Sequence, residues 1–322
     1  MYDNSHNSET FDDKSLLNLA LLLTLILFLI AIVSLYFTRS IRPPHGPGTL
    51  VVEESKNPFD DLVLEASSVL VADINTGEVY FEKNADEIVP LASITKIMTA
   101  VTALDILPQT SVITIDTSFL AQEGDSGLFG GEQWQLRDLL DVSLIESSND
   151  AAAAIAATAG VRKVPEGDLS MGREQFIRNM NIKAASLGMA TARFYNETGL
   201  DVSTEVSGGY SSARDLAKLY SYAIKKYPEI FEGTKESSVT IVSENNIGHN
   251  VTNTNKSVNK VPNIIASKTG YTDLAGGNLG IVFEPGLGNP IVVIVLGSSV
   301  DGRFTDVEKL SYAALEYIRE ER

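Results

Sequence analysis

The sequence predicts an α/β protein of the α+β kind, in which one mainly antiparallel sheet lies beside a helical subdomain and a single transmembrane helix precedes both. Three observations support this prediction. Residues 15–37 are almost entirely apolar and carry no charge. Strand-like apolar runs gather at both ends of the remaining chain, whereas helical periodicity fills residues 136–226. Strands from the two ends can therefore form one sheet, with the helical segment inserted between them.

The N-terminal 61 residues are predicted to form a membrane anchor with flanking segments. Residues 1–14 are polar and acidic and are expected to be a disordered tail. At about 1.5 Å per residue, the helix 15–37 is long enough for a hydrocarbon core of about 30 Å. A cleaved signal peptide would have a basic start, a shorter apolar run and a small-residue cleavage site, so we predict an uncleaved anchor. Residues 38–61, which contain several Pro and Gly, form a linker to a folded domain at 62–322.

The charges beside the anchor conflict with the location that the chemistry requires. Arg39 and Arg42 follow the apolar run, whereas Asp12, Asp13 and Lys14 precede it. Because basic residues favour the cytoplasmic side, these charges alone would leave the C-terminal domain in the cytoplasm. The chemistry described below needs an extracytoplasmic domain, and we give it more weight than these few charges.

Composition excludes several classes of function. The chain carries 25 Lys and Arg against 42 Asp and Glu, a net charge of −17, which argues against nucleic-acid binding. It has no cysteine, so a thiol nucleophile and disulfides are excluded. Of three histidines, His6 and His45 fall in the tail and linker, which leaves His249. A zinc site built from several imidazoles is therefore excluded, no metal or cofactor is expected, and lysine becomes the most plausible base for a serine nucleophile.

The folded domain divides into alternating apolar runs and segments of helical period. Strands are predicted at 66–73, 78–82, 112–115, 239–242, 264–267, 279–283 and 291–296. Helices are predicted at 93–104, at 136–157 with a break at 146–150, and at 173–187, 212–226 and 305–322. The helix 93–104 is apolar on nearly every side, so it should be buried in the middle of the domain.

Ser93 and Lys96 open this buried helix and form the first candidate site. Residues at i and i+3 share a helix face, so the hydroxyl and the amine can meet. The partial positive charge of the helix N-terminus should lower the pKa of Lys96. A neutral lysine beside a serine is a general base beside a nucleophile, although this short pattern alone is common.

Two further short motifs follow in order. Ser147-Ser-Asn149 falls in the predicted break between two helices, and Lys268-Thr-Gly270 ends a predicted strand. The intervals from residue 93 to 147 and from 147 to 268 are 54 and 121 positions. Ser-x-x-Lys, Ser-x-Asn and Lys-Thr-Gly in this order are typical of penicillin-binding proteins and class A β-lactamases.

The sequence from Leu62 to Arg322 resembles the serine D-Ala-D-Ala carboxypeptidases of the low-molecular-mass penicillin-binding protein group, peptidase family S11. The stretches that carry the resemblance are 91–100, 131–133, 137–140, 146–152, 196–200, 211–217 and 268–272. Two departures are visible. Ser148 stands where the family often has glycine, and the additional C-terminal β domain and membrane-binding helix of several members are missing. The N-terminal anchor takes the place of that helix.

The resemblance implies a β-lactamase/transpeptidase-like fold and a catalytic centre. Ser93 would attack the carbonyl of the penultimate D-alanine of a peptidoglycan stem pentapeptide and release the terminal D-alanine. Lys96 would be the base, kept neutral by the helix end and by the charge of Lys268, and Ser147 would relay a proton. β-lactams would acylate Ser93 and act as covalent inhibitors.

The resemblance also implies how the substrate is held. Asn149 would hold the substrate amide, a charged Lys268 and the Thr269 hydroxyl would bind the terminal carboxylate, and Gly270 would let the ligand approach the backbone. The backbone N–H groups of Ser93 and Tyr271 would form the oxyanion hole.

Several alternatives remain open. A D,D-endopeptidase would use the same site, and an inactive wall-binding homologue would keep the fold alone. A class A β-lactamase would need a deacylating glutamate, for which Glu197 is the candidate. Gly124-Asp-Ser126-Gly resembles a trypsin-like nucleophile loop but is interpreted as a turn at the mouth of the site. Trp134 could line a peptide groove but fits the core better.

Overall fold

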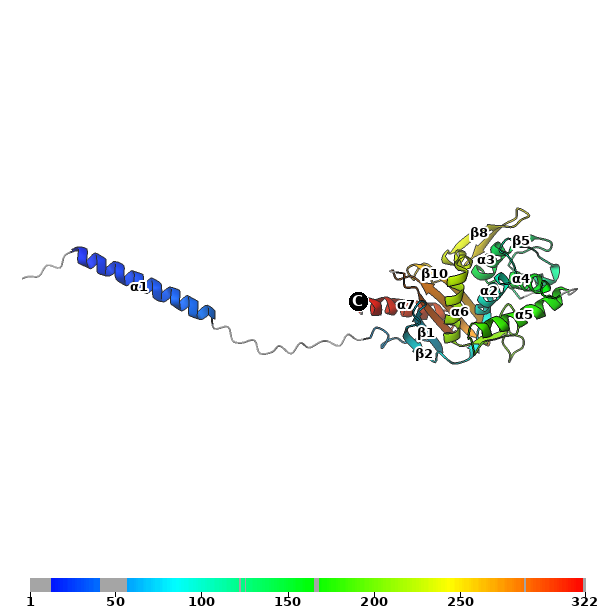
Figure 1. Ribbon diagram of the computed structural model, residues 1–322, viewed down its shortest axis with the longest axis horizontal. Helices are drawn as coiled ribbons and strands as arrows, with labels where there is room; N and C mark the ends of the chain where they lie inside the picture. Colours follow the sequence, from blue (N-terminus) through cyan, green and yellow to red (C-terminus); the bar gives the residue numbers. More distant parts are fainter. Residues whose placement is uncertain are drawn as a thin grey trace, which may run out of the picture. The chain divides into compact units, whose positions relative to one another are not determined.

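The computed structural model describes residues 13–40, 57–121, 123–124, 126–164, 168–286 and 288–320 in two compact units, Met1–Glu54 and Ser55–Arg322. The first unit contains helix α1 (Asp13–Ser40), drawn in blue in Figure 1. Its stretch Leu17–Tyr36 is long and apolar enough to cross a membrane. The predicted helix at 15–37 is confirmed as a helix, whereas most of the predicted tail and linker lies outside the described residues.

The second unit is built on a five-stranded antiparallel sheet with the order β10-β11-β12-β1-β2. The strands are β1 (Ser68–Asp73), β2 (Val79–Lys83), β10 (Ile264–Thr272), β11 (Gly276–Phe283) and β12 (Ile291–Ser298). Val71 of β1 lies opposite Val293 of β12, so the two ends of the domain meet in the sheet. This confirms the predicted architecture.

Helices cover both faces of the sheet. Successive β1 side chains point to opposite faces, so Leu70 and Val71 belong to different core clusters. Helix α7 (Gly302–Glu320) packs on the Val71 face, and α6 (Ala213–Lys226) packs on the Leu70 face. Ser212 caps α6 by accepting a hydrogen bond from the backbone N–H of Asp215, as its cap position predicts.

The helical subdomain contains α2 (Thr95–Leu104), α3 (Leu136–Ile145), α4 (Asn149–Val161) and α5 (Leu169–Ser186). Every residue of α2 from Thr95 to Ala103 is buried, as its all-round apolar pattern predicts. Helices α4 and α5 cross closely at two glycines: a Cβ on Gly160 would lie 1.8 Å from the carbonyl oxygen of Gly172. These two helices therefore pack closely within the subdomain, which is drawn cyan to green in Figure 1.

Short elements complete the fold. Small sheets are formed by β3 (Val89–Pro90), β7 (Gly209–Ser211) and β6 (Arg193–Phe194), by β4 (Val112–Thr114) and β5 (Gln133–Gln135), and by β8 (Ser238–Val242) and β9 (Gly248–Thr252). The 3-10 turns are η1 (Ala92–Ile94), η2 (Thr117–Ala121), η3 (Pro228–Phe231) and η4 (Gly233–Lys235). Trp134 on β5 is fully buried, which confirms its interpretation as a core residue. Strands β3, β5, β6, β7 and β9 were not predicted, because runs of two to five residues carry too little periodicity.

Candidate active site

Ser93 lies in the turn η1, directly before α2, and its side chain is partly exposed. The preceding Ala92 has φ of 48°, in the left-handed region that residues other than glycine rarely adopt. Such backbone strain persists only where surrounding structure holds it, and it is concentrated at functional sites. Here β10 holds the turn from one side: a Cβ on Gly270 would lie 2.7 Å from the Leu91 carbonyl oxygen and 3.1 Å from the Ser93 nitrogen.

Lys96 is fully buried, and its amine is placed to act as a base. Its Nζ lies 2.9 Å from Ser93 Oγ, 2.7 Å from Asn149 Oδ1 and 2.8 Å from the Thr198 carbonyl oxygen. A carbonyl and an amide oxygen only accept hydrogen bonds, so they take both N–H bonds of a neutral amine. The remaining lone pair is then left for the Ser93 hydroxyl.

Burial lowers the pKa of Lys96 to about 7, while the charge of Glu197 acts in the opposite direction. The prediction of a lowered pKa is confirmed, but its stated cause is wrong. Desolvation, rather than the helix N-terminus or Lys268, is the main cause, because the amine is enclosed on every side.

The predicted break between two helices places Ser147 and Asn149. Ser147 has φ of 70°, which turns the chain sharply between α3 and α4. Asn149 begins α4, and its Nδ2 donates to the Glu123 carbonyl oxygen at 2.6 Å while its Oδ1 accepts from Lys96. The side chain therefore connects α2, α4 and the segment around Glu123.

Ser148, which stands where the family often has glycine, contributes its side chain as well as its backbone. Its Oγ accepts from the Ala151 backbone N–H at 3.0 Å and so caps α4. The same oxygen lies 2.5 Å from Ser126 Oγ, which secures the neighbouring segment.

Strand β10 brings the third motif to the same cleft. Lys268 Nζ donates to Ser147 Oγ at 2.8 Å and to the Thr269 carbonyl oxygen at 2.9 Å. Thr269 Oγ1 lies 2.5 Å from Thr254 Oγ1, and Arg303 of α7 donates to the Gly270 carbonyl oxygen at 2.6 Å. The strand continues to Thr272, so Lys268 lies inside it and not at its end as predicted.

The pKa of Lys268 lies well below the ordinary lysine value because of burial, followed by the charges of Lys96 and Arg303. Burial therefore disfavours the charged form of Lys268 that carboxylate binding is predicted to use. An anion bound beside it would favour the charged form, so carboxylate binding and protonation are coupled.

The free edge of β10 faces Ser93. Gly270 pairs with Asn278 and Tyr271 with Gly277 of β11. Because Lys268 donates to the Thr269 carbonyl, and because N–H and C=O groups alternate along a strand, the backbone groups of Thr269 and Tyr271 point away from β11. Tyr271, whose side chain is 48% exposed, thus presents its N–H at the edge that Gly270 brings against Ser93.

The alternative nucleophile and base candidates are engaged elsewhere. Glu197 is fully buried, and its carboxylate forms an ion pair with Arg173 at 2.5 Å. A buried and paired carboxylate disfavours the deacylating role of a β-lactamase glutamate. Ser126 contacts Ser148, whereas His249 Nε2 lies 2.7 Å from Glu132 Oε1. Asp125 of the trypsin-like pattern lies outside the described residues, so its interpretation as a turn stays a prediction, whereas Ser126 contacts Ser148 beside the site.

Three site residues, Thr198, Thr254 and Arg303, were not assigned roles from the sequence. A signal existed for the first, because 196–200 carries part of the resemblance. There Asn196 Oδ1 accepts from the Gly199 N–H at 2.6 Å, and a Cβ on Gly199 would lie 1.9 Å from the Ala92 carbonyl oxygen. Thr254 and Arg303 lie in segments that showed no comparable pattern.

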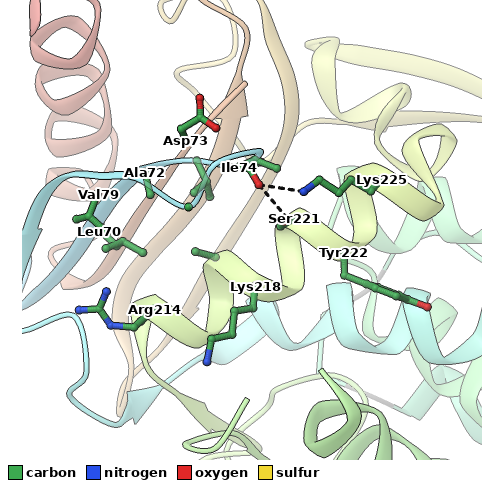
Figure 2. A pocket seen from close by; sticks show the side chains of 13 residues that line it. Leu70, Ala72, Asp73, Ile74, Val79, Arg214, Lys218, Ser221, Tyr222 and Lys225 are labelled. Carbon is green, nitrogen blue, oxygen red and sulfur yellow. Dashed lines mark hydrogen bonds between the residues drawn. The ribbon is translucent and has the colours of Figure 1, made fainter. Parts of the chain in front are cut away.

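A cavity of about 550 Å³ lies apart from these motif residues, between α6 and strands β1 and β2. Figure 2 shows its apolar floor and the Ile74 carbonyl, which accepts from Ser221 and Lys225. Its other cations are paired, Arg214 with Glu82 and Asp86 and Lys218 with Asp215. Within the described parts of the chain, no group of three or more His, Asp and Glu side chains could hold a metal ion.

Gly270→Ala is expected to reduce Ser93 acylation by a β-lactam at least about tenfold and to destabilise the fold by about 1–3 kcal/mol, because the added methyl group would push β10 from the nucleophile turn. Stopped-flow acylation and denaturant unfolding would measure the two effects. Gly248→Ala is the matched control, since a Cβ there meets no atom within 4 Å. Equal behaviour of both variants would contradict the proposed contact.

Comparison with known proteins agrees with this geometry. The sequence profile of the D-alanyl-D-alanine carboxypeptidases, peptidase family S11, matches residues 53–299. A D-alanyl-D-alanine endopeptidase of Pseudomonas aeruginosa is 33% identical over 77% of this chain and 76% of its own length. The D-alanyl-D-alanine carboxypeptidase DacF of Bacillus subtilis is 31% identical over 84% of this chain and 68% of its own length.

Solved structures show the same fold. A D-alanyl-D-alanine carboxypeptidase from Mycobacterium tuberculosis superposes with a TM-score of 0.69 at 26% identity, over 79% of this chain and 92% of that chain. Penicillin-binding protein D2 from Listeria monocytogenes, in its ampicillin-bound form, gives 0.63 at 29% identity over 79% and 98%. The predicted β-lactamase/transpeptidase-like fold is therefore confirmed. Because the profile spans well over half of the sequence, the chain belongs to the D-alanyl-D-alanine carboxypeptidase family, peptidase family S11, a family of serine hydrolases.

Proposed function

We propose that this protein removes the terminal D-alanine from peptidoglycan stem pentapeptides through an acyl-enzyme on Ser93. The observation that carries the proposal is the set of three contacts around Lys96. Two obligate acceptors and one hydroxyl surround a buried amine whose pKa is about 7, so the amine can accept the proton of Ser93 at neutral pH.

The acylation step follows from this arrangement. Ser93 Oγ attacks the carbonyl carbon of the penultimate D-alanine, and its proton passes to Lys96. The negative charge on the substrate oxygen is stabilised by the backbone N–H groups of Ser93 and Tyr271, where one such donor typically contributes about 3 kcal/mol. Ser147 relays a proton to the leaving nitrogen, the C–N bond breaks, and D-alanine departs. Water then attacks the ester, with Lys96 as base, and restores Ser93.

The cationic end of the cleft selects a terminal carboxylate. Lys268 lies on β10, and Arg303 of α7 contacts the same strand. These two basic side chains gather at one end of the cleft in a chain whose net charge is −17. The Thr269 hydroxyl adds a hydrogen-bond donor for the carboxylate. Asn149 holds the substrate amide once its contact with the Glu123 carbonyl is exchanged, and Gly270 keeps the strand backbone within reach.

We further propose that α1 is a single-pass anchor and that the segment between α1 and Phe59, which is buried in the core of the second unit, links it to an extracytoplasmic catalytic domain. A peptidoglycan substrate requires that location, which outweighs the few basic residues after the helix. β-lactams would react with Ser93 in the manner of a substrate and inhibit the enzyme. The ampicillin-bound structure of the Listeria relative supports this expectation.

A D,D-endopeptidase is the second candidate. The Pseudomonas aeruginosa relative and one from Escherichia coli, at 33% and 31% identity, are both named D-alanyl-D-alanine endopeptidases. Such an enzyme would form the same acyl-enzyme from a cross-linked peptide. The leaving group would then be the amine of the acceptor peptide instead of free D-alanine.

The two activities separate in one assay. The full-length protein in detergent is incubated with a pentapeptide ending in D-Ala-D-Ala and, separately, with a cross-linked peptide dimer. We expect free D-alanine from the pentapeptide. Cleavage of the dimer without release of D-alanine from the pentapeptide would replace the carboxypeptidase assignment with the endopeptidase one.

A further inference from the structure

A buried carboxylate lies on the segment that contacts the base of the catalytic centre. Glu197 is fully buried, and its Oε1 accepts a hydrogen bond from Arg173 Nη2 of α5 at 2.5 Å. We propose, on the basis of the function proposed above, that Glu197 is a positioning residue whose carboxylate stabilises the ammonium form of Lys96 while that amine holds the proton of Ser93.

Two hydrogen bonds tie the segment of Glu197 to the helix that carries the base. The Glu197 carbonyl oxygen accepts from Thr99 Oγ1 at 2.7 Å, and the Thr198 carbonyl oxygen accepts from Lys96 Nζ at 2.8 Å. Thr99 and Lys96 are three residues apart and therefore share one face of α2. Two consecutive residues of the segment thus bind one face of this helix, which fixes the position of Glu197 relative to the base.

The charge of Glu197 is withdrawn from water. Its side chain is fully buried, and its Oε2 has no hydrogen-bond partner within the part of the chain that the structure describes. The side chain of Arg173, which is only partly buried, forms the ion pair with it. A buried charge is screened much less than an exposed one. Burial lowers the pKa of Lys96 to about 7, and the charge of Glu197 opposes that effect, so the carboxylate favours the protonated amine.

A counter-charge is needed because the base becomes a buried cation during acylation. As Ser93 Oγ bonds to the carbonyl carbon, its proton moves to Lys96 Nζ and stays there until the leaving nitrogen is protonated. An ammonium group that is enclosed away from water is costly without an opposite charge. Asn149 Oδ1 and the Thr198 carbonyl supply hydrogen bonds to this amine but no net charge. Glu197 supplies the charge.

Other ionisable side chains on the helices around α2 have partners of their own or lie beside other segments: Asp138 and Asp141 of α3, Asp150 of α4, Lys183 of α5 and Asp215 of α6. Burial also raises the pKa of Asp141 to about 7. The second amine of the cleft is Lys268, whose pKa is lowered by burial and then by the charges of Lys96 and Arg303. These groups are the same in every variant below, so a difference between two pH profiles isolates the charge of Glu197.

Glu197→Gln removes the charge and keeps the shape, and its amide oxygen can still accept from Arg173. The rate of acylation of the full-length protein by a chromogenic β-lactam is followed by stopped flow from pH 5 to pH 9. We expect the pH of half-maximal rate to fall by about one pH unit in the variant. Because a less basic amine is a weaker base, the plateau rate should fall about three- to tenfold.

The two profiles should cross. At pH 5 more of the amine is neutral in the variant, so it should be acylated at least as fast as the unmodified protein. Glu174→Gln is the matched control, because it removes the same charge from an exposed side chain of α5 that pairs with Arg178. It should keep the profile of the unmodified protein.

A merely structural role of Glu197 would lower the rate equally at every pH. Such a parallel loss, or an unchanged profile, would overturn the role of Glu197 while acylation of the unmodified protein still supports the proposed function. If denaturant unfolding shows that Glu197→Gln alone is unstable, Arg173→Gln combined with it removes both charges and should give the same crossing. Absence of both acylation and D-alanine release in the unmodified protein would overturn the proposed function and this inference together.

Discussion

Ser93→Ala is expected to abolish covalent labelling by a fluorescent penicillin and to lower D-alanine release at least about 10⁴-fold, the scale seen when a serine hydrolase loses its nucleophile. The fold should remain intact, because the side chain of Ser93 is partly exposed and its only lost hydrogen bond among the described residues is the one with Lys96. Gel fluorescence after labelling and a coupled D-alanine assay would measure the two effects.

The matched control for this substitution is Ser186→Ala, an exposed serine in the last turn of α5 whose hydroxyl contacts the Lys183 carbonyl. It should label and turn over normally. Persistent labelling of Ser93→Ala would assign the nucleophile to another residue, and Ser126 would then need to be tested.

Acylation should depend on pH through Lys96. A lysine acts as a base only when it is neutral, and the pKa of Lys96 is about 7. The acylation rate is therefore expected to rise with pH, to reach half its plateau near pH 7, and to fall about tenfold for each pH unit below that. An alkaline decline should follow below the ordinary lysine range, because the pKa of Lys268 is also lowered and its charge is needed for the substrate carboxylate.

Two replacements separate the charge of Lys96 from its basicity. Lys96→Arg keeps a charge that cannot be released, and Lys96→Met keeps the length without a base. Both should lose about 10²–10⁴-fold in acylation and lose the limb near pH 7, whereas Lys163→Met, at an exposed position, should retain it. A profile that rises only above pH 9 would mean that Lys96 has an ordinary pKa and is not the base.

Much of the site could be predicted from the sequence because its geometry is local or motif-bound. Ser93 and Lys96 meet because they are three residues apart on one turn. The predicted helix break at 146–150 is the segment that carries Ser147 and Asn149 to the site. The burial of α2 followed from its apolar residues on all sides. The family match confirms the resemblance that the three motifs carried together.

The remaining features depend on contacts between distant parts of the chain. Lys96 loses its proton readily because other segments enclose it, and the Thr198 carbonyl that orients it comes from 102 residues away. The contact of Arg303 with the Gly270 carbonyl, 33 residues away, has no local pattern either. The length of β10 could not be predicted from local pattern, because it depends on the pairing of this strand with β11.

The sequence by itself determined the residue types, their order and the local turns, since these depend on propensity and spacing within a few residues. Only the tertiary structure decided why the pKa of Lys96 is lowered, because pKa values depend on how much water and charge surround a group. It also decided that Gly270 of β10 lies against the turn that presents Ser93, since these two segments come from distant parts of the chain.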